Sequence, residues 1–138
     1  MSREVDEQVR HDHVVELLYR EYYNYPNPAQ PHLLTFVNHP YKSRGARDEQ
    51  GNELFPDILV FWPRTDRLMM VAEVETESTV NPEEAQEWES FSRLGANFYL
   101  YVPHGLGGVA DLLCKDISVT ELVEYRREDA RFLIKRYR

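Results

Sequence analysis

Three acidic residues stand at the borders of strongly apolar segments. Asp57 opens the run DILVFW, and Glu73 and Glu75 close the run LMMVAEVE. A carboxylate among apolar residues is costly to bury unless a proton or a cation compensates its charge. Carboxylate oxygens are ligands that Mg²⁺ prefers in proteins. The three acids are therefore candidate ligands of a divalent cation.

The two apolar runs predict a β-hairpin that would bring these acids together. Both are almost continuously apolar, as strands covered on both faces are, and five residues, PRTDR, join them. If the turn centres near Thr65, opposed residues have numbers that add to about 130, and Asp57 lies opposite Glu73. Glu75, two residues further on, shares their face. A register shifted by one residue would send Asp57 to the other face.

The rest of the chain predicts the elements that would position this hairpin. The spacing of apolar residues, and the Pro and Gly residues between the apolar segments, predict these elements. Before the hairpin we expect a helix over 3–23, a strand over 32–38 and a charged loop over 41–53. After it we expect a helix from the Asn81 cap to 94, a strand over 97–102, a short helix over 108–115 and a strand over 118–125. Residues 130–137 fit a helix or, more closely, a strand. We therefore expect one α/β domain over residues 1–138, with a mixed central sheet flanked by helices.

The first predicted helix carries two histidines that do not form a metal site together. His11 and His13 are two residues apart, so they point to nearly opposite faces of a helix and cannot bind one ion jointly. We expect both to be surface residues. The core face of this helix is predicted from apolar residues near helical spacing, namely Val5, Val9, Leu17, Leu18 and Tyr22.

Charge is distributed unevenly along the 138 residues. The net charge is −8, which repels polyanions and argues against a general nucleic-acid coating protein. Six of the 16 basic residues lie in the basic C-terminal segment, residues 126–138, beside two acids, so that segment is +4 and the preceding 125 residues carry −12. Seven carboxylates and no Lys or Arg lie from Glu73 to Glu89, which indicates a solvated helix face, a cation site, or both.

The composition also narrows the setting in which the protein works. No apolar run approaches the roughly 20 residues needed to cross a bilayer, and the first ten residues are too polar for a secretory signal. The single cysteine, Cys114, permits no internal disulfide. We expect a soluble, cytoplasmic protein without membrane contacts.

The motif and the order of the elements resemble the PD-(D/E)XK nuclease-like superfamily, also called restriction endonuclease-like. The residues that carry the resemblance are Pro56-Asp57, a hairpin, Glu73-Val74-Glu75, and then a helix followed by the strand NFYLYVP. The resemblance covers roughly residues 3–125. It implies a restriction endonuclease-like core.

The resemblance also implies a metal site with Mg²⁺ or Mn²⁺ as the cofactor. Asp57, Glu73 and the main-chain carbonyl of Val74 would bind the cation. Glu75 stands where the superfamily usually has lysine, which is a departure. It would then act as a ligand or general base, and positive charge would have to come from the cation or from a residue elsewhere.

Several further residues are candidates for accessory roles. The superfamily often adds an acid from the first helix to the metal site, and Glu16 is the best match for it. It also often has a glutamine on the helix after the motif, and Gln86 matches that position. The alternative for both residues is that they are solvated helix residues without a role in the site. Arg93, Lys42, Arg44 and Arg47 are candidate replacements for the lysine. The last three, with the basic C-terminal segment, are also the candidate nucleic-acid-binding residues.

The functional hypothesis is a metal-dependent nuclease that hydrolyses phosphodiester bonds of nucleic acid, with DNA as the favoured substrate and RNA as the second. Its catalytic residues would be Asp57, Glu73 and Glu75. A single acidic domain would bind nucleic acid weakly, and a homodimer or a larger complex would add basic surface for that binding. The alternative is a catalytically inactive domain of the same fold that serves as a binding or structural partner, which the missing lysine and the acidic balance favour. A third interpretation is that the acids simply end two strands at solvent.

Overall fold

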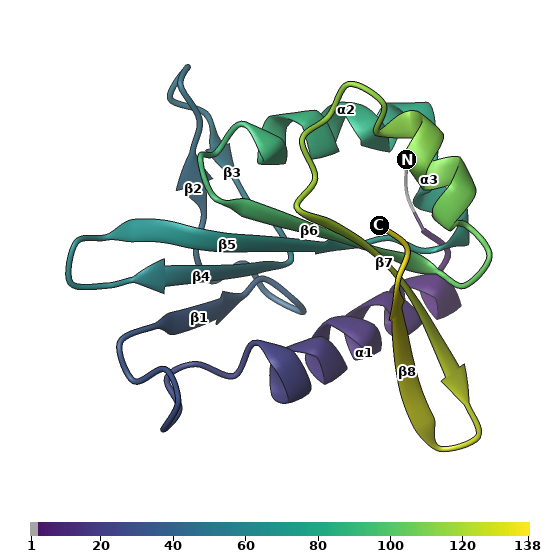
Figure 1. The fold of residues 1–138 in the computed structure, drawn as a ribbon, viewed down its shortest axis with the longest axis horizontal. Coiled ribbons are helices and arrows are strands. Elements are labelled where there is room, and N and C mark those ends of the chain that lie inside the picture. Colours follow the sequence, from purple (N-terminus) through teal and green to yellow (C-terminus); the bar gives the residue numbers. More distant parts are fainter. Residues whose placement is uncertain (1–2) are drawn as a thin grey trace.

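The predicted hairpin lies within a curled six-stranded sheet (Figure 1). The computed structural model describes residues 3–138. The strand order is β1-β4-β5-β6-β7-β8, with β1 at Leu34–Val37, β4 at Ile58–Trp62, β5 at Arg67–Val74, β6 at Asn97–Pro103, β7 at Glu121–Glu128 and β8 at Arg131–Arg136. Strands β5, β6 and β7 are parallel, and the other neighbours are antiparallel. The predicted mixed sheet and the strand near the C-terminus are confirmed.

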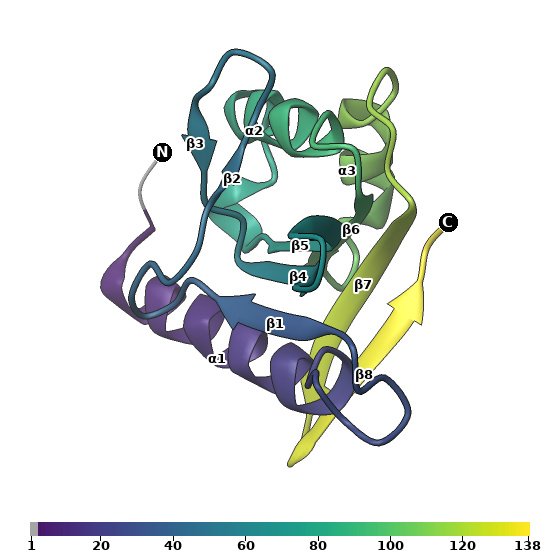
Figure 2. The same ribbon diagram turned by 90° about the vertical axis from the view of Figure 1, so that its left-hand side faces the viewer.

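Three helices flank the sheet on its two faces (Figure 2). Helix α1 (Val5–Tyr22) covers one face, and α2 (Pro82–Ser92) and α3 (Gly107–Leu113) cover the other. The short 3₁₀ helix η1 (Glu77–Thr79) links β5 to α2. Helix α2 begins as predicted, because the side chain of Asn81 accepts a hydrogen bond from the Glu84 N–H at 2.9 Å. None of the helices within residues 3–138 is long and apolar enough to cross a membrane.

The central strands are buried on both faces, which explains their unbroken apolar sequences. On β5, Ala72 and Val74 pack with the buried residues of α1, whereas Val71 packs with Trp88 of α2. Successive strand residues alternate between faces, so Glu73 belongs to the α2 side of the sheet. Asp57, which precedes β4, instead contacts His11 of α1.

The register of the hairpin is the one that the sequence predicts. The pairs Ile58↔Ala72, Leu59↔Val71 and Val60↔Met70 all have numbers that add to 130. A bulge between Val60 and Phe61 then shifts the pairing by one residue toward the turn. Because the bulge lies on the turn side, it leaves the acidic end of the hairpin in the predicted register.

Helix α1 buries a face that shares only Leu18 with the predicted one. Its buried residues are Glu7, His11, Val14, Val15 and Leu18, which form one stripe at spacings of four, three, one and three. Val5 and Val9, which were expected in the core, are 80% and 63% exposed. The prediction was wrong because it followed apolar residues alone, and the first half of the buried stripe is polar.

The charged loop predicted over 41–53 contains a small second sheet. Strand β2 (Ala46–Arg47) pairs antiparallel with β3 (Glu53–Leu54). The turn between them includes Gly51 at φ +84°, a conformation that favours glycine. Two-residue strands carry too little periodicity to be predicted from the sequence.

Candidate metal centre

Asp57 and Glu73 meet at the end of the β4–β5 hairpin, as the register requires. The Asp57 N–H donates to Glu73 Oε1 at 2.9 Å, and the Val74 N–H donates to Asp57 Oδ2 at 2.7 Å. Asp57 is 3% exposed, Glu73 7% and Glu75 1%. The interpretation in which these acids end two strands at solvent is therefore wrong. The structure buries all three acids, although only the first two contact each other directly.

Two histidines complete the surroundings of Asp57. His11 Nε2 lies 3.1 Å from Asp57 Oδ2, and His39 Nε2 lies 2.5 Å from Asp57 Oδ1. One ligand atom from each of the three residues lies within 4.8 Å of the others. The second ring nitrogens of both histidines approach Asp12 Oδ1, at 2.9 Å for His11 and 3.3 Å for His39. Metal-binding histidines are commonly oriented by a carboxylate in this way.

The expectation that His11 lies at the surface is wrong, since it is 1% exposed. Its spacing from Val14, Val15 and Leu18 is that of a single helix face, and this signal is present in the sequence. His39 follows the edge strand β1, and no local pattern marks it as a site residue. Its role follows from the contact with Asp57 alone.

The directions of the pKa shifts indicate that the two histidines balance the charge of Asp57 but not that of Glu73 as well. Burial raises the pKa of Asp57, but the charges and hydrogen bonds of His11 and His39 outweigh burial and hold it well below its usual range. Burial, followed by the negative charges of Asp57 and Glu75, raises the pKa of Glu73 well above its usual range. Burial beside Asp57 therefore favours the protonated form of Glu73, a role that a divalent cation could take by balancing the two carboxylates.

Glu75 is held by two donors on the side of the sheet that α2 covers. The Trp88 indole N–H donates to Glu75 Oε2 at 2.6 Å, and Arg3 Nη2 donates to Glu75 Oε1 at 3.1 Å. Burial raises the pKa of Glu75 to about 8 although these donors favour its ionised form. Both carboxylate oxygens therefore have partners within the chain.

Arg3 supplies the positive charge beside the motif. Its Nε donates to Thr76 Oγ1 at 2.8 Å, and its Nη2 approaches the Val74 carbonyl oxygen at 3.3 Å as well as Glu75. Its side chain is 14% exposed. Sequence reasoning did not single out Arg3, because it lies 72 residues from Glu75 along the chain.

The acid that α1 brings toward the motif segment is Glu7. Glu7 is buried, and it accepts hydrogen bonds from Thr76 Oγ1 at 2.6 Å and from the Ser78 N–H at 3.1 Å. Glu16, the predicted accessory ligand, has a side chain that is 57% exposed and pairs with Arg20 at 2.8 Å. The structure does not bring Glu16 into the buried cluster.

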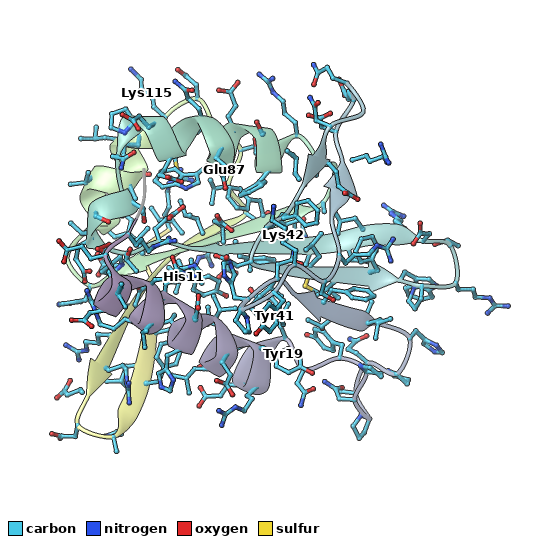
Figure 3. The ribbon with its side chains drawn as sticks, turned by 180° about the vertical axis from the view of Figure 1, so that it is seen from behind. His11, Tyr19, Tyr41, Lys42, Glu87 and Lys115 are labelled. Carbon is cyan, nitrogen blue, oxygen red and sulfur yellow. The ribbon has the colours of Figure 1, made fainter. Side chains whose placement is uncertain are left out.

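Helix α2 directs the carboxyl group of Glu87, rather than the predicted Gln86, toward the centre. Both residues keep much of their surface exposed, but Glu87 forms a hydrogen bond with Glu73. Loss of solvent around its carboxyl group, followed by the negative charges of Glu84 and Asp57, raises the pKa of Glu87, and the hydrogen bond opposes this shift. Figure 3 shows Glu87 on α2 and His11 on α1, with strands of the sheet between the two helices. Glu87 adds a fourth carboxyl group to the cluster.

The basic residues considered from the sequence have local partners. Lys42 Nζ lies 4.5 Å from the centre of the Phe55 ring. Arg44 stacks 4.0 Å from the Phe61 ring and pairs with Asp66 at 2.7 Å, while Arg47 donates to the Gly51 carbonyl at 3.1 Å. Arg93, the residue after α2, pairs with Glu89 of that helix. The structure brings none of these cations into hydrogen-bonding contact with Asp57, Glu73 or Glu75 among the described residues.

Comparison with known proteins gives no assignment of family. No protein-family model, curated protein or solved structure matches this chain. Function is therefore inferred from the buried cluster of acids and histidines and from the order of the elements around it.

Proposed function

We propose that this chain is a divalent-metal-dependent nuclease with a PD-(D/E)XK type of core, which hydrolyses phosphodiester bonds of nucleic acid, DNA first. The order of the elements supports this, because an antiparallel β1-β4-β5 unit precedes α2 and the parallel strands β6 and β7. The observation that carries the proposal is the convergence of Asp57, Glu73, His11 and His39 at the end of one hairpin.

The donor set suits a divalent cation. Asp57 offers carboxylate oxygens, and His11 and His39 offer imidazole nitrogens beside them; Glu73 adjoins Asp57 but lies outside this group of three. The proton that the raised pKa keeps on Glu73 would leave when a cation binds. Mg²⁺ prefers oxygen ligands, whereas imidazole favours first-row transition ions, so this set suits Mn²⁺ better than Mg²⁺.

The chemistry divides between the cation and residues of this chain. A bound cation would lower the pKa of a water molecule and balance negative charge on a phosphate. Asp12 orients the rings of His11 and His39 toward Asp57. Glu75 holds Arg3 at the end of β5, which provides a fixed positive charge near the position of the superfamily's lysine.

The second candidate function is a catalytically inactive domain that binds a partner. The position of Arg3 favours it, because its guanidinium already donates to the Val74 carbonyl that the resemblance assigns to the cation. Glu75 likewise has both oxygens engaged by Trp88 and Arg3. These contacts leave neither Val74 nor Glu75 free to bind the cation without a rearrangement.

Titration with metal tests the proposal. Calorimetry with Mn²⁺ and with Mg²⁺ is expected to show one binding site and a heat that depends on the buffer, because Glu73 releases a proton. Plasmid and single-stranded DNA should be cleaved with the metal and left intact when a chelator is added. Absence of binding for both ions would overturn the site, and binding without cleavage would support the inactive domain.

A glutamine at position 11 should change the preference between the two ions. His11→Gln removes an imidazole nitrogen, so the affinity for Mn²⁺ should fall about 10–100-fold while the affinity for Mg²⁺ changes less. Calorimetry with each ion measures this difference. His13→Gln is the matched control, since His13 is two residues away and is expected to leave both affinities unchanged. Equal effects of the two substitutions would exclude His11 as a ligand.

A further inference from the structure

A groove of about 610 Å³ runs between the N-terminal half of α1 and the outer part of β7. Its lining includes apolar groups from three elements: Val9 and Val14 of α1, Pro103 at the end of β6, and Tyr125 of β7. Val9 is 63% exposed here, and Tyr125 is half-buried. Val14 and Pro103 are buried, so the apolar surface that this chain leaves uncovered belongs to Val9 and Tyr125.

The rim of the groove is basic although the protein is acidic. Arg10, Arg126 and Arg127 line it together with His13 and His104. Glu77 is the only acid among the described lining residues, and it pairs with Arg10 at 3.2 Å; Glu128, just outside the lining, pairs with Arg126 at 3.2 Å. With neutral histidines the lining carries +2, in a chain whose net charge is −8. Such a local reversal of sign attracts a polyanion to this groove rather than to the whole surface.

The groove begins next to the candidate metal centre. The Tyr125 hydroxyl donates to the Glu75 carbonyl oxygen at 2.6 Å, and Glu77 follows Glu75 by two residues. The parallel strands β5, β6 and β7 end along the same edge of the sheet, where open α/β sheets bind their ligands. The groove thus adjoins the end of β5 that carries the motif, while Asp12 and His39 line a separate pocket between α1 and β1.

We propose that this groove binds a single-stranded segment of nucleic acid, with phosphates at Arg10, Arg126 and Arg127 and bases against Val9 and Tyr125. The assignment of nucleic acid rests on the proposed function. A basic rim beside an apolar or aromatic surface is the combination by which proteins hold single strands. In this proposal nucleic acid is held at α1 and at Arg126 and Arg127, which belong to the basic C-terminal segment that the sequence suggested; a contact with the loop residues Lys42, Arg44 and Arg47 stays a prediction.

Salt-dependent binding measurements test the groove. Fluorescence anisotropy of a short labelled oligothymidylate, in buffer with a chelator to prevent cleavage, is expected to show binding to the wild-type chain. In R126Q/R127Q the affinity should fall by about tenfold or more, and the slope of log K against log salt should decrease by about 1.4, since each single-strand phosphate contact contributes about 0.7. R131Q/R136Q is the matched control, because it removes the same charge from β8 outside the groove lining.

The outcomes separate this inference from the proposed function. An equal loss in R126Q/R127Q and R131Q/R136Q, with thermal unfolding showing both folded, would mean diffuse attraction and would overturn the groove. Tighter binding of a duplex of the same length would overturn the single-strand assignment. Binding that depends on the groove, without metal-dependent cleavage, would support the groove as a binding site and contradict the nuclease. Metal-dependent cleavage that is unchanged in R126Q/R127Q would support the nuclease and contradict the groove.

Discussion

Replacing Asp57 with asparagine is expected to abolish cation binding and DNA cleavage together. The amide side chain of Asp57→Asn would keep one oxygen to accept the Val74 N–H, but it would lose the negative charge that faces His11 and His39. The loss of cation affinity should exceed the about 10–100-fold that removal of an outer-shell partner costs. Calorimetry with Mn²⁺ and a plasmid cleavage assay measure the two effects.

Glu16→Gln is the control for this substitution. It removes the same charge from an exposed residue of α1 that pairs with Arg20, so cation affinity and cleavage should stay at the wild-type level. If Asp57→Asn still bound the cation, the cluster would not be the metal site. If Glu16→Gln lost binding, the ligand predicted from the sequence would be correct and the structural position of Glu16 would be misleading.

Without a divalent cation, the protein should lose stability as the pH rises from about 5 to about 9. Burial raises the pKa of Glu73, and that of Glu75 to about 8. Each group stabilises the folded state fully below its unfolded pKa of 4.5, and this contribution disappears as the pH rises through the folded pKa. The raised pKa of His11 acts in the same direction, whereas Asp57, with its lowered pKa, contributes a constant amount in this window. The total change should be on the order of a few kcal/mol.

Denaturant unfolding at several pH values, with a chelator or with Mn²⁺, measures this effect. The cation should restore most stability at high pH, because it binds the ionised acids. Glu73→Gln should flatten the pH dependence, and Glu83→Gln, at an exposed position of α2, should leave it unchanged. Stability that stays level or rises over this range in the chelated protein would contradict the raised pKa values.

The arrangement of Asp57 and Glu73 was predictable because few registers were available to the hairpin. Two apolar runs and a five-residue connection leave essentially two choices of face, and the pairing Ile58↔Ala72 matches the one predicted. The bulge at Val60 was not predictable, because neither Gly nor Pro marks it. It had no effect on the site since it lies beyond the acids, on the turn side.

The other residues of the centre were not predictable from local patterns. His11 interacts with Asp57 across 46 residues, and Arg3 with Glu75 across 72. Apolar periodicity identified α1 as a helix, but it assigned the wrong face because the buried Glu7 and His11 are polar. A polar residue enters a core only with a partner, and that partner belongs to another element.

The polar stripe of α1 also has a consequence for the order in which the molecule assembles. Arg3, Glu7 and His11 bond to residues at the open end of the hairpin, which lie 72, 69 and 46 residues further along the chain. Long-range contacts of this kind form after local ones, since the entropy of closing the intervening chain must first be overcome. The centre therefore exists only when the first helix has docked onto a finished sheet. Fraying of that helix end would disassemble the centre while the rest of the sheet stayed folded.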